Sequence, residues 1–194
     1  MNSLIKVTLI AMILTMGCAS VKVEITGSQL KTPLCTSDTS PVSTVVYWGP
    51  QWRPNQKEPK LREAAALQGI NDFLKGIRCI TVLGVRRLTW ESERPSNNNI
   101  LKLTSESRLK PARVLLIVIR ELGPHLKIGL PSIIEGGTEV KIDVEVLDTQ
   151  TLMSLSSTQT RWTNGGTFVI KGTSSLSQDI SSALSAVLFP KLVI

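Results

Sequence analysis

The chain has 194 residues, of which 42% are hydrophobic and 19% are charged. This length and composition fit one folded domain plus a targeting segment, and they exclude a disordered protein. Lysine and arginine number 22 against 15 aspartate and glutamate, a formal charge of +7 that suits an anionic partner. The single histidine and three cysteines exclude a multi-histidine metal site and a four-cysteine zinc site.

The first residues have the pattern of a secretory signal. Lys6 precedes an apolar run from Val7 to Met16. This run of ten residues, interrupted only by Thr8 and Thr15, is too short to span a bilayer, which takes about 20, but it suits the core of a signal peptide. The run ends at Gly17-Cys18, which resembles the signal of bacterial lipoproteins, although the usual leucine position holds Thr15.

The resemblance to lipoproteins implies that residues 1–17 are removed and that Cys18 is acylated and becomes the mature N-terminus. Ala19 rather than aspartate follows the cysteine, which in enterobacterial lipoproteins implies export to the outer membrane, with the protein facing the periplasm. The alternatives are an ordinary signal peptide that is cut elsewhere, or a short buried helix.

Acylation of Cys18 leaves Cys35 and Cys79 as the remaining cysteines. Thiols are oxidised in the periplasm, so these two residues form either one disulfide or two separate buried thiols. A disulfide would tie the N-terminal segment to the middle of the domain.

Apolar and β-branched residues predict strands in six places: 21–26, 42–48, 79–88, 113–122, 138–148 and 152–162. Residues 113–122 are the strongest of these, and six consecutive apolar residues predict a central strand that ends at Gly123-Pro124. In 138–148, four apolar residues alternate with Lys141, Asp143 and Glu145, which indicates a half-exposed antiparallel strand. Glycine pairs at 136–137 and 165–166 are interpreted as hairpin turns.

Three helices are expected. The first begins at Pro59 and carries Leu67, Ile70, Leu74 and Ile77 at helical spacing. A weaker one covers Ile100 to Leu109, opened by Asn99. The last follows a capping box at Ser175–Gln178, and its apolar stripe ends at Pro190.

This order of elements predicts an α+β fold, a two-layer α/β sandwich in which a mixed sheet with an antiparallel C-terminal meander has helices packed on one face. The domain organisation is a signal peptide over 1–17, a lipidated N-terminus and tether over 18–41, and a single periplasmic domain over 42–194.

The sequence does not predict an enzyme. His125 has the context of a loop histidine, and Asp143 and Glu145 are interpreted as a solvated strand face rather than as a catalytic pair. No spacing predicts a metal site or a cofactor. The positive charge is dispersed, so nucleic acid is not an expected partner, and proximity to anionic lipid or polysaccharide explains it better.

One loop combines residue types that are common at interfaces. Tyr47, Trp48, Trp52 and Arg53 lie at a strand end beside prolines, and Trp162 suggests a second edge of the same kind. Either these residues contact a partner or membrane, or Trp48 and Trp52 pack on the core. The apolar segment 126–134 contains Gly129 and Pro131, so it is either an insertion over the sheet or a contact loop.

In element order, the mature chain resembles the small α/β domains of bacterial envelope lipoproteins, such as curli- and Pel-type export lipoproteins and auxiliary lipoproteins of lipid-transport ABC systems. The resemblance implies a non-enzymatic, membrane-anchored accessory subunit of an envelope assembly or export system, with other envelope proteins as partners and a homo-oligomer as one arrangement. The alternative is a lipoprotein that binds a glycan, lipid or peptide.

Overall fold

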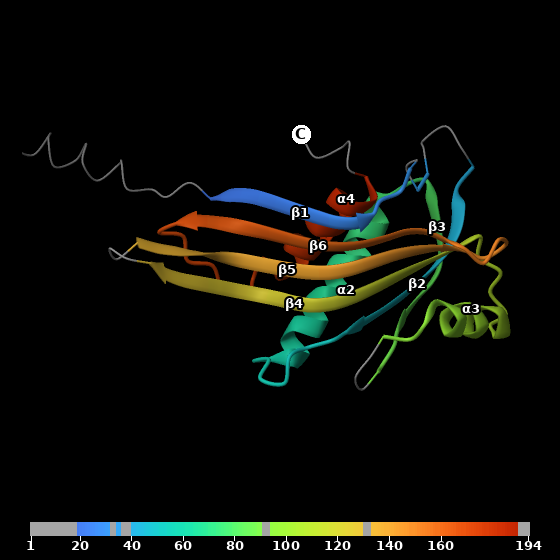
Figure 1. Ribbon diagram of the computed structural model, residues 1–194, viewed down its shortest axis with the longest axis horizontal. Coiled ribbons are helices and arrows are strands. Elements are labelled where there is room, and N and C mark those ends of the chain that lie inside the picture. The colour runs from blue at the N-terminus through green and yellow to red at the C-terminus, as the bar shows by residue number, and fades with distance from the viewer. Residues whose placement is uncertain (1–18, 32–33, 36–39, 91–93, 130–132, 190–194) are drawn as a thin grey trace, which may run out of the picture.

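The computed structural model describes residues 19–31, 34–35, 40–90, 94–129 and 133–189. Within these ranges it has a six-stranded mixed sheet in the order β1-β6-β5-β4-β2-β3 and three helices (Figure 1). The prediction of an α+β fold with an antiparallel meander is confirmed. The elements are β1 (Ser20–Ser28), β2 (Val42–Pro50), α2 (Pro59–Gly76), β3 (Ile80–Arg87), α3 (Asn97–Glu106), β4 (Arg113–Gly129), β5 (Ile133–Asp148), β6 (Ser154–Thr167) and α4 (Leu176–Leu188).

The sheet has a parallel part and an antiparallel part. Strand β2 pairs in parallel with both β3 and β4. Strands β4, β5 and β6 form the antiparallel meander, and β1 adds to β6 as an edge strand. Residues 20–28, expected in the tether, are therefore part of the sheet, and the domain begins before residue 42.

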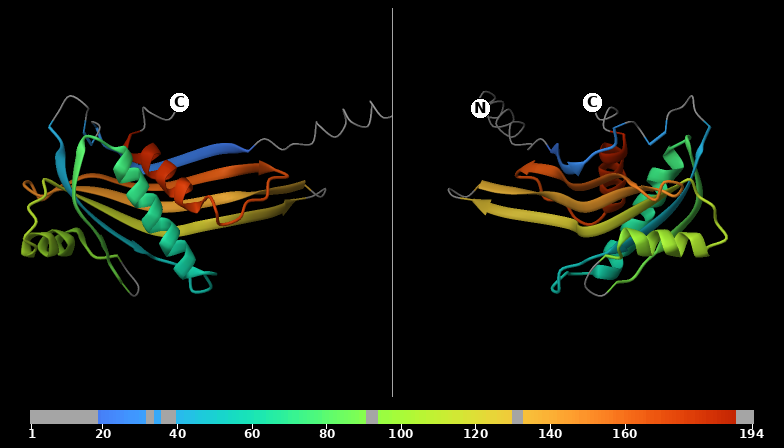
Figure 2. Two further views of the ribbon diagram at one scale, coloured as in Figure 1. Left: turned by 180° about the vertical axis from the view of Figure 1, so that it is seen from behind. Right: turned by 45° about the vertical axis from the view of Figure 1, so that its right-hand side comes forward.

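Helices α2 and α4 pack on one face of the sheet, here called the helix face (Figure 2). Helix α3 covers the opposite face over β2 and β4, so the expectation of helices on one face holds for α2 and α4 only. Right-handed crossovers explain this. From β2 the chain crosses through α2 to β3 at the edge of the sheet. From β3 it crosses in the opposite direction, past β2, through α3 to β4. Crossovers of the same hand that run in opposite directions place their helices on opposite faces of the sheet.

The central position of β4 is also confirmed. Val114 to Ile119 are fully buried between β2 and β5. Leu115, Ile117 and Ile119 pack in the cluster that contains Leu74 of α2 and Leu184 of α4. Val114 and Leu116 pack instead with Ile100 and Leu101 of α3.

The sequence predicts that β4 ends at Gly123-Pro124 and that the glycine pairs 136–137 and 165–166 form turns, and both predictions are wrong. Strand β4 continues through Gly123 and Pro124 to Gly129, paired with β5 throughout. Beyond Ile119 it no longer pairs with β2 and becomes an edge, where proline is tolerated because no partner needs its missing N–H. The glycine pairs 136–137 and 165–166 lie opposite each other in β5 and β6 rather than in turns.

Three local predictions about the helices are wrong. Leu67 is exposed, and Ala66, Gly69, Ile70, Phe73 and Leu74 form the buried side of α2. Helix α3 is capped by Ser96, whose hydroxyl accepts from the Asn99 N–H at 3.3 Å. Ser175 makes no capping bond, because its hydroxyl donates to the carboxylate of Asp179 at 3.0 Å.

Candidate functional site

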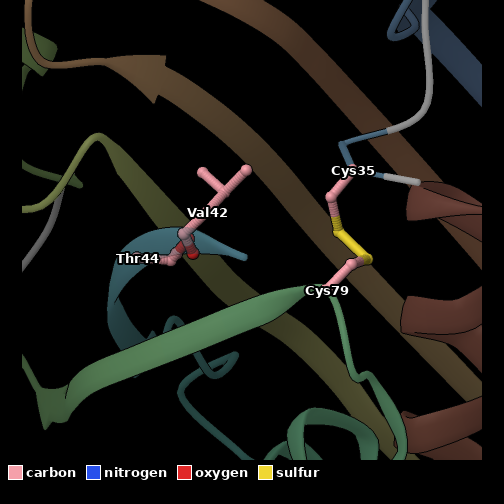
Figure 3. Close-up of a disulfide and its surroundings, with 4 residues drawn as sticks. All are labelled: Cys35, Val42, Thr44 and Cys79. Carbon is pink, nitrogen blue, oxygen red and sulfur yellow. A yellow bond between two sulfur atoms is a disulfide. The ribbon is translucent and has the colours of Figure 1, made fainter. Parts of the chain in front are cut away.

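Cys35 and Cys79 form a disulfide at the start of β2 and β3 (Figure 3). Their Cα atoms are 5.7 Å apart, and 44 positions of sequence separate them. The N–H of Val42 donates to the carbonyl of Cys79 at 2.9 Å, so the bond ties the segment after β1 to the parallel part of the sheet. Disulfides form and persist in oxidising compartments and are rare in the cytosol. Cys18 lies outside the described residues.

Three of the predicted interface residues are in the core. Trp48 and Trp162 are buried beneath α2 and α4, and Tyr47 is buried on the α3 side, near the hydroxyl of Thr104. Strand β2 is covered on both faces, so consecutive side chains from Thr44 to Trp48 are buried, including the two aromatic ones. These residues therefore cannot contact a partner in the folded protein.

Trp52 and Arg53 remain at the surface, in the loop after β2. The indole of Trp52 is half-buried, and its Nε1 donates to Glu63 Oε1 at 3.4 Å. Arg53 is exposed, and its Nε lies 3.4 Å from Glu121 Oε2. The loop is thus held against α2 and β4, with the face of Arg53 available to solvent.

A buried arginine supplies a hydrogen bond to the backbone of β4 beside this loop, where the strand no longer has β2 as a partner. Arg62 of α2 donates Nη1 to the carbonyl of Leu122, and the same atom lies 3.3 Å from Glu121 Oε1. Gly123 leaves room for this group, because a Cβ there would overlap the guanidinium. The sequence carried no signal for this arrangement, since it depends on where β2 ends relative to β4.

The face opposite α2 and α4 is polar where α3 does not cover it, and ion pairs cross its strands. Arg120 pairs with Asp143 at 2.5 Å, and Arg161 pairs with Glu139 at 2.6 Å. Burial alone would raise the pKa of Glu139, but the hydrogen bond from Arg161 and the charges of Lys141 and Arg161 outweigh it and hold that pKa below its usual value. The face is mixed in sign, which suits a solvated surface.

The interpretation of Asp143 and Glu145 as solvated is wrong for Glu145. This carboxylate is buried, and it accepts from Arg94 Nη1 and from Asn97 Nδ2, both at 2.6 Å. It therefore anchors the start of α3 on the sheet. A structural role of this kind accounts for both of its oxygens.

Two hollows lie at opposite ends of the molecule. One, of about 360 Å³, is polar and lined by Lys22, His125, Lys127, Glu135, Arg161 and Thr163, among others. The Nδ1 atom of His125 is buried there without a hydrogen-bond partner among the described residues. The other, of about 500 Å³, lies beside α3 and includes Leu101, Thr104, Leu109 and Leu152.

The described residues contain no group of three or more histidine, cysteine or acidic residues that could hold a metal ion. Within the same part of the chain, no helix is both long and apolar enough to cross a bilayer.

No protein-family model matches the sequence, and no curated protein matches it. Similar solved structures include the PelC dodecamer from Paraburkholderia phytofirmans, at 14% identity and a TM-score of 0.44, covering 87% of this chain and 98% of that one. A DUF330 protein from Xanthomonas campestris has 11% identity and a TM-score of 0.37, with 86% and 89% covered. A homolog of the neuraminyllactose-binding hemagglutinin from Helicobacter pylori has 13% identity and a TM-score of 0.34, with 84% and 88% covered. Similarity at this level assigns the chain no function.

Proposed function

We propose that this protein is a non-enzymatic lipoprotein of the bacterial envelope, anchored in the outer membrane by acyl chains on Cys18 and facing the periplasm. In this proposal it serves as an accessory subunit of an envelope assembly or export system. The observation that carries it is the apolar run ending at Gly17-Cys18, immediately before the folded domain. The Cys35–Cys79 disulfide supports it, because such bonds persist in the periplasm and are rare in the cytosol.

The loop with Trp52 and Arg53 is the surface that we assign to a partner protein. Tryptophan and arginine dominate binding energy at many interfaces, and this loop is held by contacts to Glu63 and Glu121, so little ordering is needed on binding. The edges of the sheet, β1 and β3, are a second means of association. Each presents backbone groups on its outer side that can pair with another copy.

The anchor is tested by Cys18→Ala in the native host with labelled fatty acid. The wild-type protein should take up label and remain with washed membranes, whereas the variant should carry no label and be unprocessed or soluble. Buried methylenes contribute about 0.8 kcal/mol each, which makes two or more chains a stable anchor. Release of the wild-type protein by washing without detergent would contradict the anchor.

The partner surface is tested by crosslinking in intact cells. Arg53→Ala should lose partners with an unchanged melting temperature, because its side chain is exposed. Lys60→Ala, another exposed cation nearby at the start of α2, is the matched control. Trp52→Ala shows whether Trp52 contacts a partner or packs on the domain. A large drop in melting temperature, with partners lost in proportion, would make Trp52 a structural residue. Normal crosslinking by both Trp52→Ala and Arg53→Ala would exclude this loop.

The polar hollow near His125 favours one second function, the binding of a small polar ligand such as a glycan. Three cations and two carboxylates line it together with His125, and charged side chains of this kind can hydrogen-bond the hydroxyl groups of a polar ligand. Calorimetry with envelope glycans distinguishes the two functions. Binding that is lost in His125→Ala would support a ligand-binding protein.

A further inference from the structure

The end of the β4–β5 ribbon lies at the opposite end of the molecule from α3 (Figure 1). Exposed apolar residues lie in the segments that meet at this end. They are Val21, Leu126, Ile128, Phe168 and Ile170, here called the apolar tip, and their exposed fractions are 53%, 55%, 75%, 62% and 81%. Single exposed apolar residues need no explanation, but a group at one end of a fold marks a contact surface.

The apolar tip continues the helix face of the sheet beyond the helices. Leu122 lies opposite Val140 on that face and is fully buried. Leu126 and Ile128 follow it on the same side at intervals of two residues, where α2 and α4 no longer cover the strands (Figure 2). These residues are therefore apolar like those of the core, but no helix packs on them.

The segment after β6 brings its apolar residues to the same place and holds them there. The N–H of Phe168 donates to the carbonyl of Ile134 at 2.7 Å. The carbonyl of Val169 lies over Gly136, where a Cβ would be only 2.3 Å away. Phe168 has a φ of 61°, a conformation that is uncommon for a bulky residue. The backbone contacts thus fix Phe168 in an exposed position.

The start of the described chain lies beside the apolar tip. Ser20 pairs with Gly165, and its hydroxyl donates to the carbonyl of Gly165 at 3.3 Å. Only Ala19 lies between Cys18 and Ser20, and these two steps along the chain reach at most about 7 Å. Acyl chains on Cys18 would enter a membrane next to this patch.

The charges near the apolar tip suit an anionic surface. Lys22, Lys127 and Lys171 lie in the segments that form it, with Glu24 and Glu135 as the acidic residues. Lys127 and Glu135 are on paired positions of the hairpin, and Glu24 lies 3.8 Å from Arg161, which leaves Lys22 and Lys171 as the excess. Basic residues beside an apolar patch attract anionic lipid headgroups while the apolar side chains enter the interface.

We propose that the apolar tip inserts into the headgroup region of an anionic bilayer beside the lipid anchor. The domain then stands with the end of the β4–β5 ribbon on the membrane, and α3 with its 500 Å³ hollow points away from it. The proposal rests on the proposed anchor at Cys18. Insertion of the apolar tip adds to the anchor by fixing the orientation of the domain, since a lipid chain alone leaves the domain free to rotate.

The test places a fluorescent reporter at each end of the full chain. Phe168→Trp reports on the apolar tip, and Met153→Trp is the matched control, because Met153 is 65% exposed in the turn between β5 and β6 at the other end. Each protein is purified from its native host in detergent and reconstituted into vesicles of phosphatidylethanolamine and phosphatidylglycerol with bromine atoms high on the acyl chains. Wild-type emission is subtracted to remove the four natural tryptophans.

We expect the emission added by Phe168→Trp to be lost in brominated vesicles and that added by Met153→Trp to be retained. Should Phe168→Trp fold poorly by its melting curve, Ile128→Trp takes its place, since Ile128 is 75% exposed. Equal quenching at both ends, or no quenching of the tip reporter in protein that floats with the vesicles, would overturn the proposal.

Flotation reports on membrane binding and intact mass on acylation, so together they distinguish failure of the apolar-tip proposal from failure of the proposed anchor. An acylated protein that floats without quenching of the tip reporter refutes the tip and leaves the anchor in place. A protein without acyl groups that floats with its tip reporter quenched refutes the anchor and supports the tip. Failure to float refutes both. A blue shift of the tip reporter that grows with protein concentration in the absence of lipid would assign the patch to contact between copies, and overturn the proposal.

Discussion

Loss of the Cys35–Cys79 disulfide should remove about 4 kcal/mol of stability. The bond closes a loop with a sequence separation of 44. In the chain-entropy treatment, a loop of this length lowers the entropy of the unfolded chain by about 13 cal/mol/K, which is about 4 kcal/mol at 25 °C. Domains typically have about 5–15 kcal/mol in total, so the effect would be a large part of the stability of this one.

The assay compares the wild-type protein with the double variant Cys35→Ala/Cys79→Ala in urea, each with and without a thiol reductant. Reductant should move the wild-type midpoint down by about 2 M, given a slope of about 2 kcal/mol/M. The double variant should already unfold near the reduced wild-type midpoint and should not respond to reductant. Because wild-type protein has the same side chains in both conditions, its shift isolates the bond from the loss of packing at the buried Cys35.

A wild-type midpoint that reductant leaves unchanged, while free-thiol labelling shows the bond to be broken, would refute this reasoning. It would mean that the segment around Cys35 is equally restricted in the unfolded chain. A double variant far less stable than the reduced wild-type protein would show instead that packing, rather than chain entropy, is the larger contribution of these two residues.

Three further predictions concern the core and the buried charges. Leu116→Ala or Ile117→Ala should cost about 2–5 kcal/mol in urea unfolding, since both side chains are fully buried on the central strand, and a negligible shift would contradict that position. Glu121→Ala should cost about 3 kcal/mol, because it leaves the buried Arg62 with one partner fewer, whereas Lys60→Ala, as a control, should be neutral. Hydrogen bonds from the backbone of Thr151 and Gln150, with the charge of Arg113, hold the pKa of Asp148 below its usual value. Its contribution is therefore present above the unfolded pKa of about 3.9 and lost as the pH falls. Asp148→Asn should flatten the acid side of the stability profile, and an unchanged profile would contradict this assignment.

The elements could be predicted where hydrophobic spacing is regular. The alternation over 138–148 identified β5, and the six apolar residues 114–119 identified a strand that is buried on both faces. Periodicity succeeds here because burial on one or both faces imposes it directly on the sequence. It fails at Leu67, where helical spacing alone did not show which side of α2 would be covered.

The glycines and Pro124 show why local signals gave the wrong boundaries. Pro124 is compatible with β4 only because β2 has already ended at Pro50, which pairs with Ile119. Gly136 is needed because the carbonyl of Val169 lies over it, 33 positions later in the chain. Both reasons are contacts between distant segments, and a turn and a close approach of backbones select the same residue type.

The candidate site was only partly accessible from the sequence. Tyr47 and Trp48 have the composition of an interface, but α3 covers one and α2 with α4 cover the other. The position of α3 follows from strand order, which the sequence did not show. Trp52 and Arg53 lie just beyond the end of β2 and so remain at the surface.

The apolar tip follows from a difference in length between the two layers. Strand β4 has 17 residues and extends about 56 Å at 3.3 Å per residue, whereas α2, with 18 residues, extends only about 27 Å. Helices of this length cannot cover the whole ribbon, and the alternation of apolar residues in β4 continues beyond them to Ile128. A stretch of this kind is costly to expose unless something else covers it, and Ser20, two positions after the proposed acylation site, is paired with Gly165 beside it. Because Gly129 and Pro131 interrupt residues 126–134, the sequence predicts either an insertion over the sheet or a contact loop there. Up to Gly129 this segment is instead regular strand without a helix above it, which is the geometry that a membrane surface can complete.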